Sequence, residues 1–285
     1  MGKVLNFIKM EGLGNDFILT DGISDEQIGG IRETFARLCD RKIGIGADGI
    51  IFILPSASCD FRMRIFNSDG SEAEMCGNGI RCFAKYLKIK GISQSDPVTI
   101  ETLAGPVTVG QVDRDTFRVT MGKPVLKPEL IPLNMEMVQE SGAERFMMQP
   151  LEIDGKVFDI SAVSMGNPHA VLYADALTDE LVCGIGPAIE CHELFPKKTN
   201  VEFIKVLSDR EIQMRVYERG CGETSACGTG ACAAVVSGII NGLHGKRVVV
   251  HLPGGDLLVA WDGNPDSGVY MTGPALVVFS GTVEL

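Results

Sequence analysis

Apolar and polar residues alternate along several short stretches of the chain, with the period of two that is typical of a half-exposed strand. The alternation is clearest over residues 61–66 and 211–217. Residues 49–54 form instead a continuous apolar run between turn residues, which predicts a buried strand. Strand patterns of this kind dominate the sequence and predict a sheet-rich protein.

A helical period marks a few longer stretches. Apolar residues at helical spacing predict a surface helix over 25–39, and Ser24 with Gln27 matches a capping box at its start. Two further helices are predicted over 80–87 and 231–243. The last contains almost no charged residue, so we expect it to be buried.

Glycines mark where these two later helices stop. We expect the first to end at Gly91 and the second at Gly245. A cysteine precedes each helix, in Cys76-Gly-Asn-Gly and Cys227-Gly-Thr-Gly. Both cysteines are therefore predicted to lie at a helix N-terminus.

The two cysteine segments belong to a long internal repeat. Counted from Arg64 and from Arg215, both segments place an aromatic residue at +2, a glutamate at +8, the cysteine at +12 and glycines at +13 and +15. Similar elements flank both segments, including a Gly-Asn before an apolar run and a later pair of strands ending in Met and Pro. A period near half the chain indicates a duplicated domain.

A helix N-terminus presents unpaired N–H groups and a partial positive charge, which lower a cysteine's pKa and stabilise its thiolate. The glycines let backbone N–H groups approach a bound anion. Two such elements, at Cys76 and Cys227, could hold one carboxylate between two sulfurs. One sulfur would take the α-proton as thiolate and the other would return a proton to the opposite face as thiol.

Other interpretations remain open for these residues. A single Cys-Gly-x-Gly is more often a buried cysteine before a turn, and duplication alone could preserve the glycines. A cysteine can also act as a covalent nucleophile. A thiol-based redox sensor or an anion-binding protein is the alternative outside the enzymes. The duplicated setting favours proton transfer by two thiols.

Composition narrows the class of protein. The net charge of −11 argues against nucleic acid or an anionic membrane as partner. Neither a signal peptide nor a membrane-spanning run is recognised, so a cytoplasmic protein is expected. The nine cysteines lack Cys-x-x-Cys pairs and the four histidines are scattered, which predicts neither a disulfide framework nor a metal site. Most cysteines are expected to be small buried apolar residues.

Several motifs together resemble the diaminopimelate epimerase family over essentially the whole chain. They are Gly12-Leu-Gly-Asn15-Asp-Phe17, Gly44-Ile-Gly-Ala-Asp48, Arg64-Ile-Phe-Asn67-x-Asp-Gly-Ser-Glu72, Cys76-Gly-Asn-Gly-x-Arg-Cys82, Met165-Gly-Asn-Pro-His169, Tyr217-Glu-Arg-Gly220, Gly222-Glu-Thr224, Ala226-Cys-Gly-Thr-Gly230 and Leu252-Pro-Gly-Gly255. The resemblance implies an isomerase that interconverts LL- and meso-diaminopimelate without pyridoxal phosphate or another cofactor, on the route to lysine and peptidoglycan. It also implies a small-molecule substrate, and a homodimer is common in the family.

The resemblance implies a role for each matching residue. Cys76 and Cys227 match the acid/base pair, and Asn15 matches a residue near the reacting amino group. The backbone cradle of the reacting carboxylate is matched by Gly77, Asn78, Gly228 and Thr229. The pocket for the distal amino-acid head is matched by Asn67, Asn167, Asn200, Glu218 and Arg219. His169 and Glu218 match residues behind the thiols that tune them.

The distal pair Glu218-Arg219 suits a substrate with a second amino-acid head. Arginine binds a carboxylate through two parallel N–H bonds, and glutamate accepts from an ammonium. A solvated charge pair is the ordinary alternative for Glu-Arg, and a turn-forming role is the alternative for Asn15, Asn78 and Asn167. Racemases of proline or hydroxyproline, broad amino-acid racemases and phenazine-type isomerases are the rivals on the same fold.

The implied fold is α+β, with two pseudo-symmetric domains, each a curved, mostly antiparallel sheet around a central helix. We expect the first domain over 1–127, joined by a C-terminal strand at 275–285, and the second over 128–274. One departure from the family stands out. Some members carry glutamine where this chain has Gly49, so one contact to the reacting amino group is expected to be absent.

Overall fold

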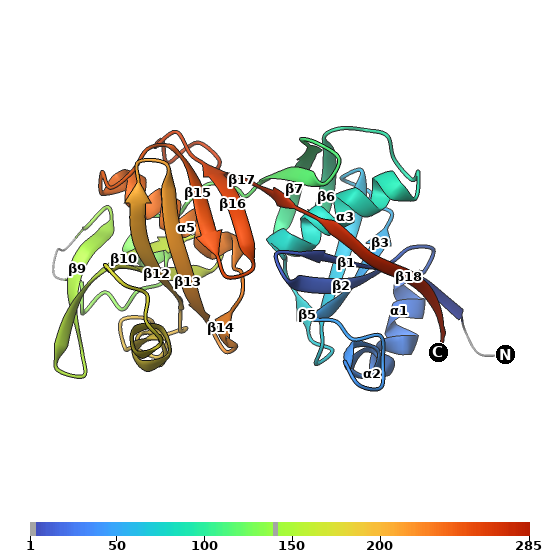
Figure 1. The fold of residues 1–285 in the computed structure, drawn as a ribbon, viewed down its shortest axis with the longest axis horizontal. Helices are drawn as coiled ribbons and strands as arrows, with labels where there is room; N and C mark the ends of the chain where they lie inside the picture. Colours follow the sequence, from blue (N-terminus) through green and yellow to red (C-terminus); the bar gives the residue numbers. More distant parts are fainter. Residues whose placement is uncertain (1–3, 139–141) are drawn as a thin grey trace. The chain divides into compact units, whose positions relative to one another are not determined.

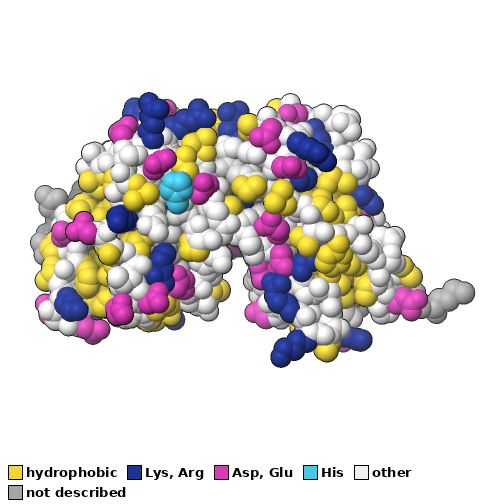
Figure 2. All heavy atoms as spheres, viewed as in Figure 1, with side chains coloured by type: hydrophobic (Ala, Val, Ile, Leu, Met, Phe, Trp, Pro, Cys, Tyr) yellow, Lys and Arg dark blue, Asp and Glu magenta, His cyan; other side chains and the backbone are white. Residues whose placement is uncertain are grey.

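The chain forms two units in the computed structural model, which describes residues 4–138 and 142–285 (Figure 1). Unit 1 comprises Met1–Thr120 and Thr272–Leu285, and unit 2 comprises Met121–Met271. No helix in the described part of the chain has the length and apolar character needed to cross a membrane. Acidic, basic and apolar side chains are interspersed on the face of each unit shown in Figure 2.

The division falls a few residues from the boundaries expected after residues 127 and 274. The backbone amide of Met121 donates to the carbonyl oxygen of Val269 at 2.8 Å. Val125 forms a bridge with Ser164, so the segment after residue 120 is fastened to unit 2. At the second boundary the Pro274 carbonyl oxygen accepts a hydrogen bond from Arg81 of unit 1 at 2.9 Å.

Unit 1 is a sheet with helices on both faces. Its strands pair antiparallel except for the parallel pairs β2–β3 and β4–β6. Its elements are β1 (Val4–Gly12), β2 (Asn15–Thr20), α1 (Asp25–Ile31), η1 (Arg32–Thr34), α2 (Phe35–Cys39), β3 (Gly49–Leu54), β4 (Phe61–Asn67), β5 (Glu72–Ala73), α3 (Gly77–Ile89), β6 (Val98–Thr102), β7 (Gly105–Gln111), β8 (Thr116–Thr120) and β18 (Leu276–Glu284).

Unit 2 repeats the same order of strands and central helix. Its parallel pairs are β11–β12 and β13–β15, the counterparts of β2–β3 and β4–β6. Its elements are η2 (Pro128–Leu130), β9 (Phe146–Ile153), β10 (Lys156–Ser164), β11 (Pro168–Tyr173), η3 (Glu180–Ile185), α4 (Gly186–Glu190), β12 (Asn200–Ser208), β13 (Glu211–Glu218), β14 (Gly222–Thr224), α5 (Gly228–Ile240), β15 (Arg247–Leu252), β16 (Gly255–Ala260) and β17 (Tyr270–Pro274), whose last residues enter unit 1.

Each sheet curves around one helix. In unit 1, α3 contacts β1 and β2 as well as β7 and β8, and in unit 2, α5 contacts β10, β11, β12 and β16. Strands far apart in the order reach the same helix only if the sheet wraps around it. Each central helix is drawn inside its own sheet in Figure 1.

The outer face of the unit 1 sheet is covered by α1 and α2. Phe35 of α2 packs on Phe52 and Phe66, with ring centroids 5.5 and 4.9 Å away. Alternate residues of a strand point to opposite faces. The residue that precedes Phe52, Ile51, accordingly faces Gly79 of α3 on the inner side. Every residue of β3 is buried, as its apolar run predicts.

The helix predictions are confirmed in part. Ser24 and Gln27 form the capping box at the start of α1. The single helix expected over 25–39 is wrong, because a 3-10 turn at Arg32–Thr34 separates α1 from α2. Gly91, with φ of 65°, follows the end of α3 as predicted.

The expected end of the second buried helix is wrong. The helix α5 ends at Ile240, and the left-handed residue after its cap is Gly242, with φ of 68°. Only a residue that tolerates positive φ can close a helix in this way, and Gly242 comes before Gly245. The burial expected for α5 is confirmed, since its first three turns are almost entirely buried.

Candidate active site

Cys76 is the N-cap residue of α3 in unit 1. Its backbone is extended, and its sulfur accepts a hydrogen bond from the amide of Gly79 at 3.5 Å. The thiol also donates to the side-chain oxygen of Asn15 at 3.6 Å. Cys76 therefore lies at the helix N-terminus, as the sequence predicts. The residue is only half-buried, which leaves part of it accessible.

Cys227 is the N-cap residue of α5 in unit 2, with the same extended backbone. Its sulfur lies 3.5 Å from the hydroxyl oxygen of Thr229. Unlike Cys76, Cys227 is buried. The duplicated elements therefore place two thiols at equivalent helix starts in unlike surroundings.

The surroundings of Cys227 oppose ionisation. Burial raises the pKa of the Cys227 thiol well above its usual range, and the carboxylates of Glu218 and Glu202 act in the same direction. The Thr229 hydroxyl and the Gly230 amide lower the pKa and do not compensate. The sequence predicts a lowered pKa from the helix end alone, and for Cys227 burial overrides it. These surroundings therefore favour the protonated thiol of Cys227.

The second glycine after each cysteine is required by close packing against a strand. A Cβ on Gly79 would lie 2.9 Å from Cδ1 of Ile51, and a Cβ on Gly230 would lie 2.6 Å from Oε1 of Glu202. A side chain at either position would force the strand residue or the first turn of the helix to move. The glycines thus let the amide ends of α3 and α5 lie directly on the sheet.

The glutamate at +8 of the repeat fastens the segment that leads to each cysteine. Arg64 holds Glu72 through two N–H···O bonds of 2.7 and 2.8 Å, and Arg215 holds Glu223 through two bonds of the same lengths. Bidentate pairs of this kind fix orientation as well as position. The sequence shows this glutamate as part of the repeat without indicating its role.

Asn15 and Asn78 lie beside Cys76 in one hydrogen-bonded network. Asn15 donates through Nδ2 to Asp48 at 2.7 Å, so its oxygen faces Cys76 and Asn78. Asn78 is buried, and its oxygen accepts from the fully buried Arg81 at 2.9 Å. Asp48 and Arg81 therefore orient two predicted site residues, and sequence analysis assigned neither of them a role.

The other predicted site residue of unit 1, Asn67, lies at the exposed end of β4 and donates to the Ser71 hydroxyl at 2.9 Å. Gly49 begins β3 next to it, in register with Asn67. A Cβ on Gly49 would lie 2.5 Å from the carbonyl oxygen of Phe66. The backbone as it stands at Gly49 therefore has no room for a side chain.

The predicted distal pocket residues of unit 2 gather where β11 and β12 begin and β13 ends. Asn200 is buried and bridges two backbones, donating to the Pro168 carbonyl oxygen and accepting from the Arg219 amide, both at 3.0 Å. The Glu218 carboxylate accepts a bond from the Thr224 hydroxyl. The Arg219 guanidinium is exposed and contacts the Lys197 carbonyl oxygen at 3.4 Å. It forms no ion pair with the acidic side chains of the described residues.

His169 and Asn167 lie beside this group. The ring of His169 is fully buried, with Nδ1 2.8 Å from Oε1 of Glu202 and Nε2 2.9 Å from Oδ1 of Asn167. Glu202 was missed by sequence analysis. Its signal is a single acidic residue inside the apolar run 201–204 of a buried strand.

The cysteines outside the site differ in burial, and Cys59 is half-buried. Cys39, Cys82 and Cys232 are buried, and burial raises the pKa of Cys82 to about 12. Cys183, Cys191 and Cys221 are exposed, so the expectation that most cysteines are buried is wrong. In the described part of the chain no cluster of three or more His, Cys, Asp or Glu side chains is arranged to hold a metal ion.

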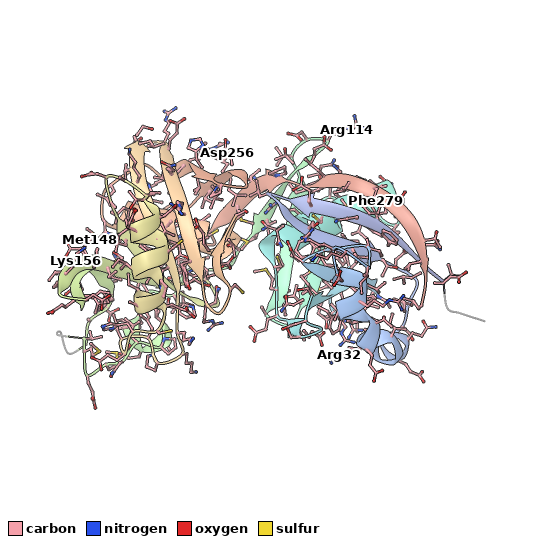
Figure 3. The ribbon with its side chains drawn as sticks, turned by 60° about the horizontal axis from the view of Figure 1, so that its bottom comes forward. Arg32, Arg114, Met148, Lys156, Asp256 and Phe279 are labelled. Atoms are coloured by element: carbon pink, nitrogen blue, oxygen red, sulfur yellow. The ribbon has the colours of Figure 1, made fainter. Side chains whose placement is uncertain are left out.

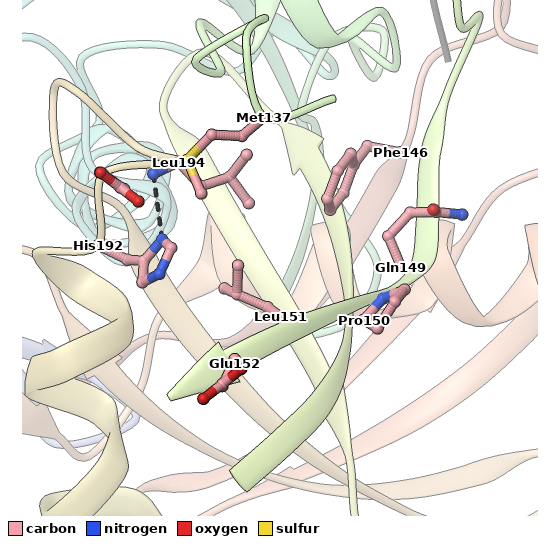
Figure 4. A pocket seen from close by; sticks show the side chains of 9 residues that line it. Met137, Phe146, Gln149, Pro150, Leu151, Glu152, His192 and Leu194 are labelled. Atoms are coloured by element: carbon pink, nitrogen blue, oxygen red, sulfur yellow. Dashed lines mark hydrogen bonds between the residues drawn. The ribbon is translucent and has the colours of Figure 1, made fainter. Parts of the chain in front are cut away.

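A cavity of about 300 Å³ in unit 2 lies apart from these residues. It is bounded by Phe146 and Leu151 of β9 and by His192 and Leu194, with the Leu194 amide donating to Nδ1 of His192 at 3.1 Å (Figure 4). No predicted site residue lines it. The candidate site is instead divided between the ends of α3 and α5, each with its own set of polar side chains.

Comparisons with known proteins show the family of the chain. Residues 7–127 and 161–278 match the family model described as diaminopimelate epimerase. A diaminopimelate epimerase of Desulfitobacterium hafniense is 49% identical over 285 residues, covering 98% of both chains. One of Pelotomaculum thermopropionicum is 50% identical, covering 97% of this chain and 98% of the relative.

Solved structures of lower identity share the fold. A hydroxyproline epimerase of Agrobacterium vitis aligns with a TM-score of 0.71 at 15% identity, covering 100% of this chain and 94% of that one. A phenazine biosynthesis protein of the PhzF family from Bacillus anthracis aligns with a TM-score of 0.67 at 16% identity, covering 99% of this chain and 100% of that one. These likenesses confirm the α+β fold of two similar halves. With its family model and its full-length relatives, the chain belongs to the diaminopimelate epimerase family.

Proposed function

We propose that this chain interconverts LL- and meso-diaminopimelate by proton transfer between two cysteines and the α-carbon. The observation that carries the proposal is the pair of cysteines capping two equivalent helices, in a member of this family. The relatives named above as diaminopimelate epimerases support the substrate. The proposal requires Cys76 and Cys227 to reach opposite faces of one α-carbon.

The proton balance is simple. A thiolate removes the α-proton and becomes a thiol, leaving the electron pair on the α-carbon and its carboxylate. The other thiol then donates a proton to the opposite face and becomes the thiolate. Because the surroundings of Cys227 favour its protonated form, we assign the donor role to Cys227 and the base role to Cys76 in the first half-reaction. The return reaction exchanges the roles.

The helix ends supply the stabilisation that this chemistry needs. Amides of Gly77, Asn78, Gly228 and Thr229 lie in the first turns of α3 and α5, where backbone N–H groups have no helical acceptor. A carboxylate gains negative charge as the α-proton leaves. Preorganised N–H donors aimed at such charge are worth about 3 kcal/mol each when removed from enzymes.

The distal head of the substrate is assigned to residues of unit 2, with Asn67 contributed by unit 1. Arg219 has an exposed guanidinium without an acidic partner among the described residues, suited to a carboxylate. Glu218 precedes it and suits an ammonium, while Asn67, Asn167 and Asn200 complete the set. A substrate with one head group would not need this set, which favours diaminopimelate over proline-type substrates.

The test is an assay with LL-diaminopimelate in D₂O that follows deuterium at the α-carbon. We expect deuterium incorporation together with the meso product. Arg219→Met should lower kcat/KM at least about a hundredfold, because two charge-assisted hydrogen bonds are lost. Arg210→Met, which changes an exposed arginine in the β12–β13 turn, is the matched control. Absence of exchange would favour a redox or anion-binding role, and full activity of Arg219→Met would remove Arg219 from the pocket.

We also propose that the chain acts in the cytoplasm as a homodimer, as is common in the family. Leu276, Val277, Val278 and Phe279 of β18 are exposed, each by 41% or more, and offer an apolar surface for a second copy. Figure 3 shows Phe279 on this strand. Sedimentation equilibrium of the purified chain should give twice the monomer mass, and a monomer at micromolar concentration would contradict the dimer.

A further inference from the structure

The two units differ at a pair of buried positions beneath their catalytic helices. In unit 1 the parallel strands β2 and β3 pair Leu19 with Ile51, and in unit 2 the parallel strands β11 and β12 pair Val171 with Glu202. Ile51 and Glu202 are also the residues nearest to a Cβ built on Gly79 and on Gly230. By register and by contact, Glu202 therefore occupies the position of Ile51.

The neighbouring position differs in the same sense. Phe17 of β2 pairs with Gly49, and His169 of β11 pairs with Asn200, the residue equivalent to Gly49. A buried phenylalanine in unit 1 thus corresponds to a buried histidine in unit 2. The sheet accepts an apolar pair at these positions in unit 1 and carries an ionisable pair in unit 2.

Burial of the Glu202 side chain costs free energy of folding. Its side chain has no exposed surface, and its Oε2 has no hydrogen-bond partner among the described residues. An apolar pair of similar size in place of a buried ion pair is often neutral or stabilising. Unit 1 shows such a pair in the same fold, so folding alone does not account for Glu202.

The hydrogen bonds of Glu202 restrict the histidine ring. If the shared proton is on Glu202, the carboxyl donates to Nδ1 and the neutral ring carries its proton on Nε2. If the proton is on the ring, both nitrogens carry one. The remaining arrangement, a neutral ring protonated only on Nδ1, leaves an uncompensated buried carboxylate and is disfavoured. In both favoured arrangements Nε2 is a donor.

A donor at Nε2 determines which way the Asn167 amide faces. The Asn167 oxygen accepts from His169 at 2.9 Å, so its NH₂ group is turned away from the ring. Asn167 is half-buried, and no partner for this NH₂ group is found among the described residues. With Nε2 as an acceptor, the amide would reverse and present its oxygen instead.

We propose that Glu202 is a positioning residue that acts through His169 to keep the Asn167 NH₂ group facing the substrate as a hydrogen-bond donor. The partner would be an acceptor group of the ligand, and with the proposed function this is a carboxylate oxygen of diaminopimelate. Unit 1 has no such pair of ionisable residues, since Phe17 and Ile51 occupy the equivalent positions. The inference rests on the proposed function only for the identity of the ligand.

The first test places the apolar residues of unit 1 at the equivalent positions of unit 2. The double variant His169→Phe with Glu202→Ile should fold, because the same pair is accommodated in unit 1. We expect KM for diaminopimelate to rise about tenfold or more, with a smaller effect on kcat, because a donor to a charged group is lost at binding. Asp256→Asn is the matched control, since it removes a carboxylate from Nδ1 of the partly exposed His251 in the β15–β16 hairpin (Figure 3).

A double-mutant cycle separates positioning from a general structural effect. If Glu202 acts through Asn167, adding His169→Phe and Glu202→Ile to Asn167→Ala should raise KM little beyond the rise caused by Asn167→Ala alone. A further tenfold rise in KM in the Asn167→Ala background would overturn the proposal, as would an unchanged KM in the double variant alone.

A substrate-free measurement keeps the two proposals distinguishable. In ¹⁵N-histidine-labelled unmodified protein, His169 should carry a proton on Nε2 throughout the neutral pH range. An Nε2 without a proton would overturn the positioning role even if the enzyme turns over diaminopimelate. A protonated Nε2 in a protein that does not exchange the substrate α-proton would leave the positioning role supported and the proposed function refuted.

Discussion

At the scale of single residues, Cys227 shows two opposite effects acting on one thiol. A helix N-terminus favours the thiolate, while burial and nearby carboxylates favour the thiol. The sequence reveals the first effect through the Cys-Gly-x-Gly pattern. It does not reveal the second, because the burial of Cys227 and the approach of Glu202 depend on the packing of α5 against β12.

The neighbouring carboxylate gives a direct prediction. Glu218→Gln removes a negative charge that raises the pKa of Cys227, so the thiolate fraction at any pH below that pKa should increase. Alkylation of Cys227 by iodoacetamide, followed by peptide mass spectrometry, should become faster at fixed pH. Glu211→Gln, at the exposed start of the same strand, is the control and should leave the rate unchanged. An unaltered rate in Glu218→Gln would show that this charge does not act on the thiol.

Residue identity alone allowed much of the site to be predicted. The cysteines, the glycines and the polar residues around them stand in motifs that the chain repeats or shares with its family. Asp48, Arg81 and Glu202 were missed because they do not themselves stand in the predicted set: Asp48 and Arg81 bond Asn15 and Asn78, and Glu202 is proposed to act on Asn167 through His169. Asp48 meets Asn15 and Glu202 meets His169 from segments 33 residues away, and such pairing is a long-range property that local sequence does not contain. Arg81 lies one turn from Asn78 on α3, but its contact depends on the burial of that helix.

At the scale of elements, local signals were reliable where the chain determines its own geometry. The capping box at Ser24 and the glycine at Gly91 both act within one turn of a helix. The break between α1 and α2 has no comparable signal, since the apolar spacing continues through it. Phe35 packs on Phe52 and Phe66 of the sheet. The helical spacing of apolar residues does not predict such a tertiary contact.

At the scale of the whole molecule, the duplication could be predicted and its boundaries only to within a few residues. Residues 121–127 look like a continuation of the first half, yet the backbones of Met121 and Val125 bond Val269 and Ser164 of unit 2. Backbone hydrogen bonds determine such a boundary, and the amino-acid composition does not predict these bonds. The same scale gives a prediction about the two thiols, because Cys76 belongs to one unit and Cys227 to the other.

If both thiols face one α-carbon, mild oxidation should join them. A disulfide requires Cα atoms about 4.4–6.8 Å apart, so its formation would report that the units bring the two sites together. We expect one Cys76–Cys227 bond by non-reducing peptide mapping, loss of epimerase activity and recovery with a reductant. Cys82→Ser, at a fully buried thiol behind the site, is the control and should still form the bond. Inactivated protein in which both thiols remain reduced would contradict the proposed apposition.

The pairing of β18 with β1 has a consequence for how the protein is made. Strand β1 lies near the start of the chain, and its partner contains residues 276–284. On the ribosome, unit 2 emerges complete while β1 still lacks this partner. The usual order, in which the N-terminal domain finishes first, is therefore reversed. Until the last strand is synthesised, one edge of the nascent N-terminal sheet stays open to pairing with other chains.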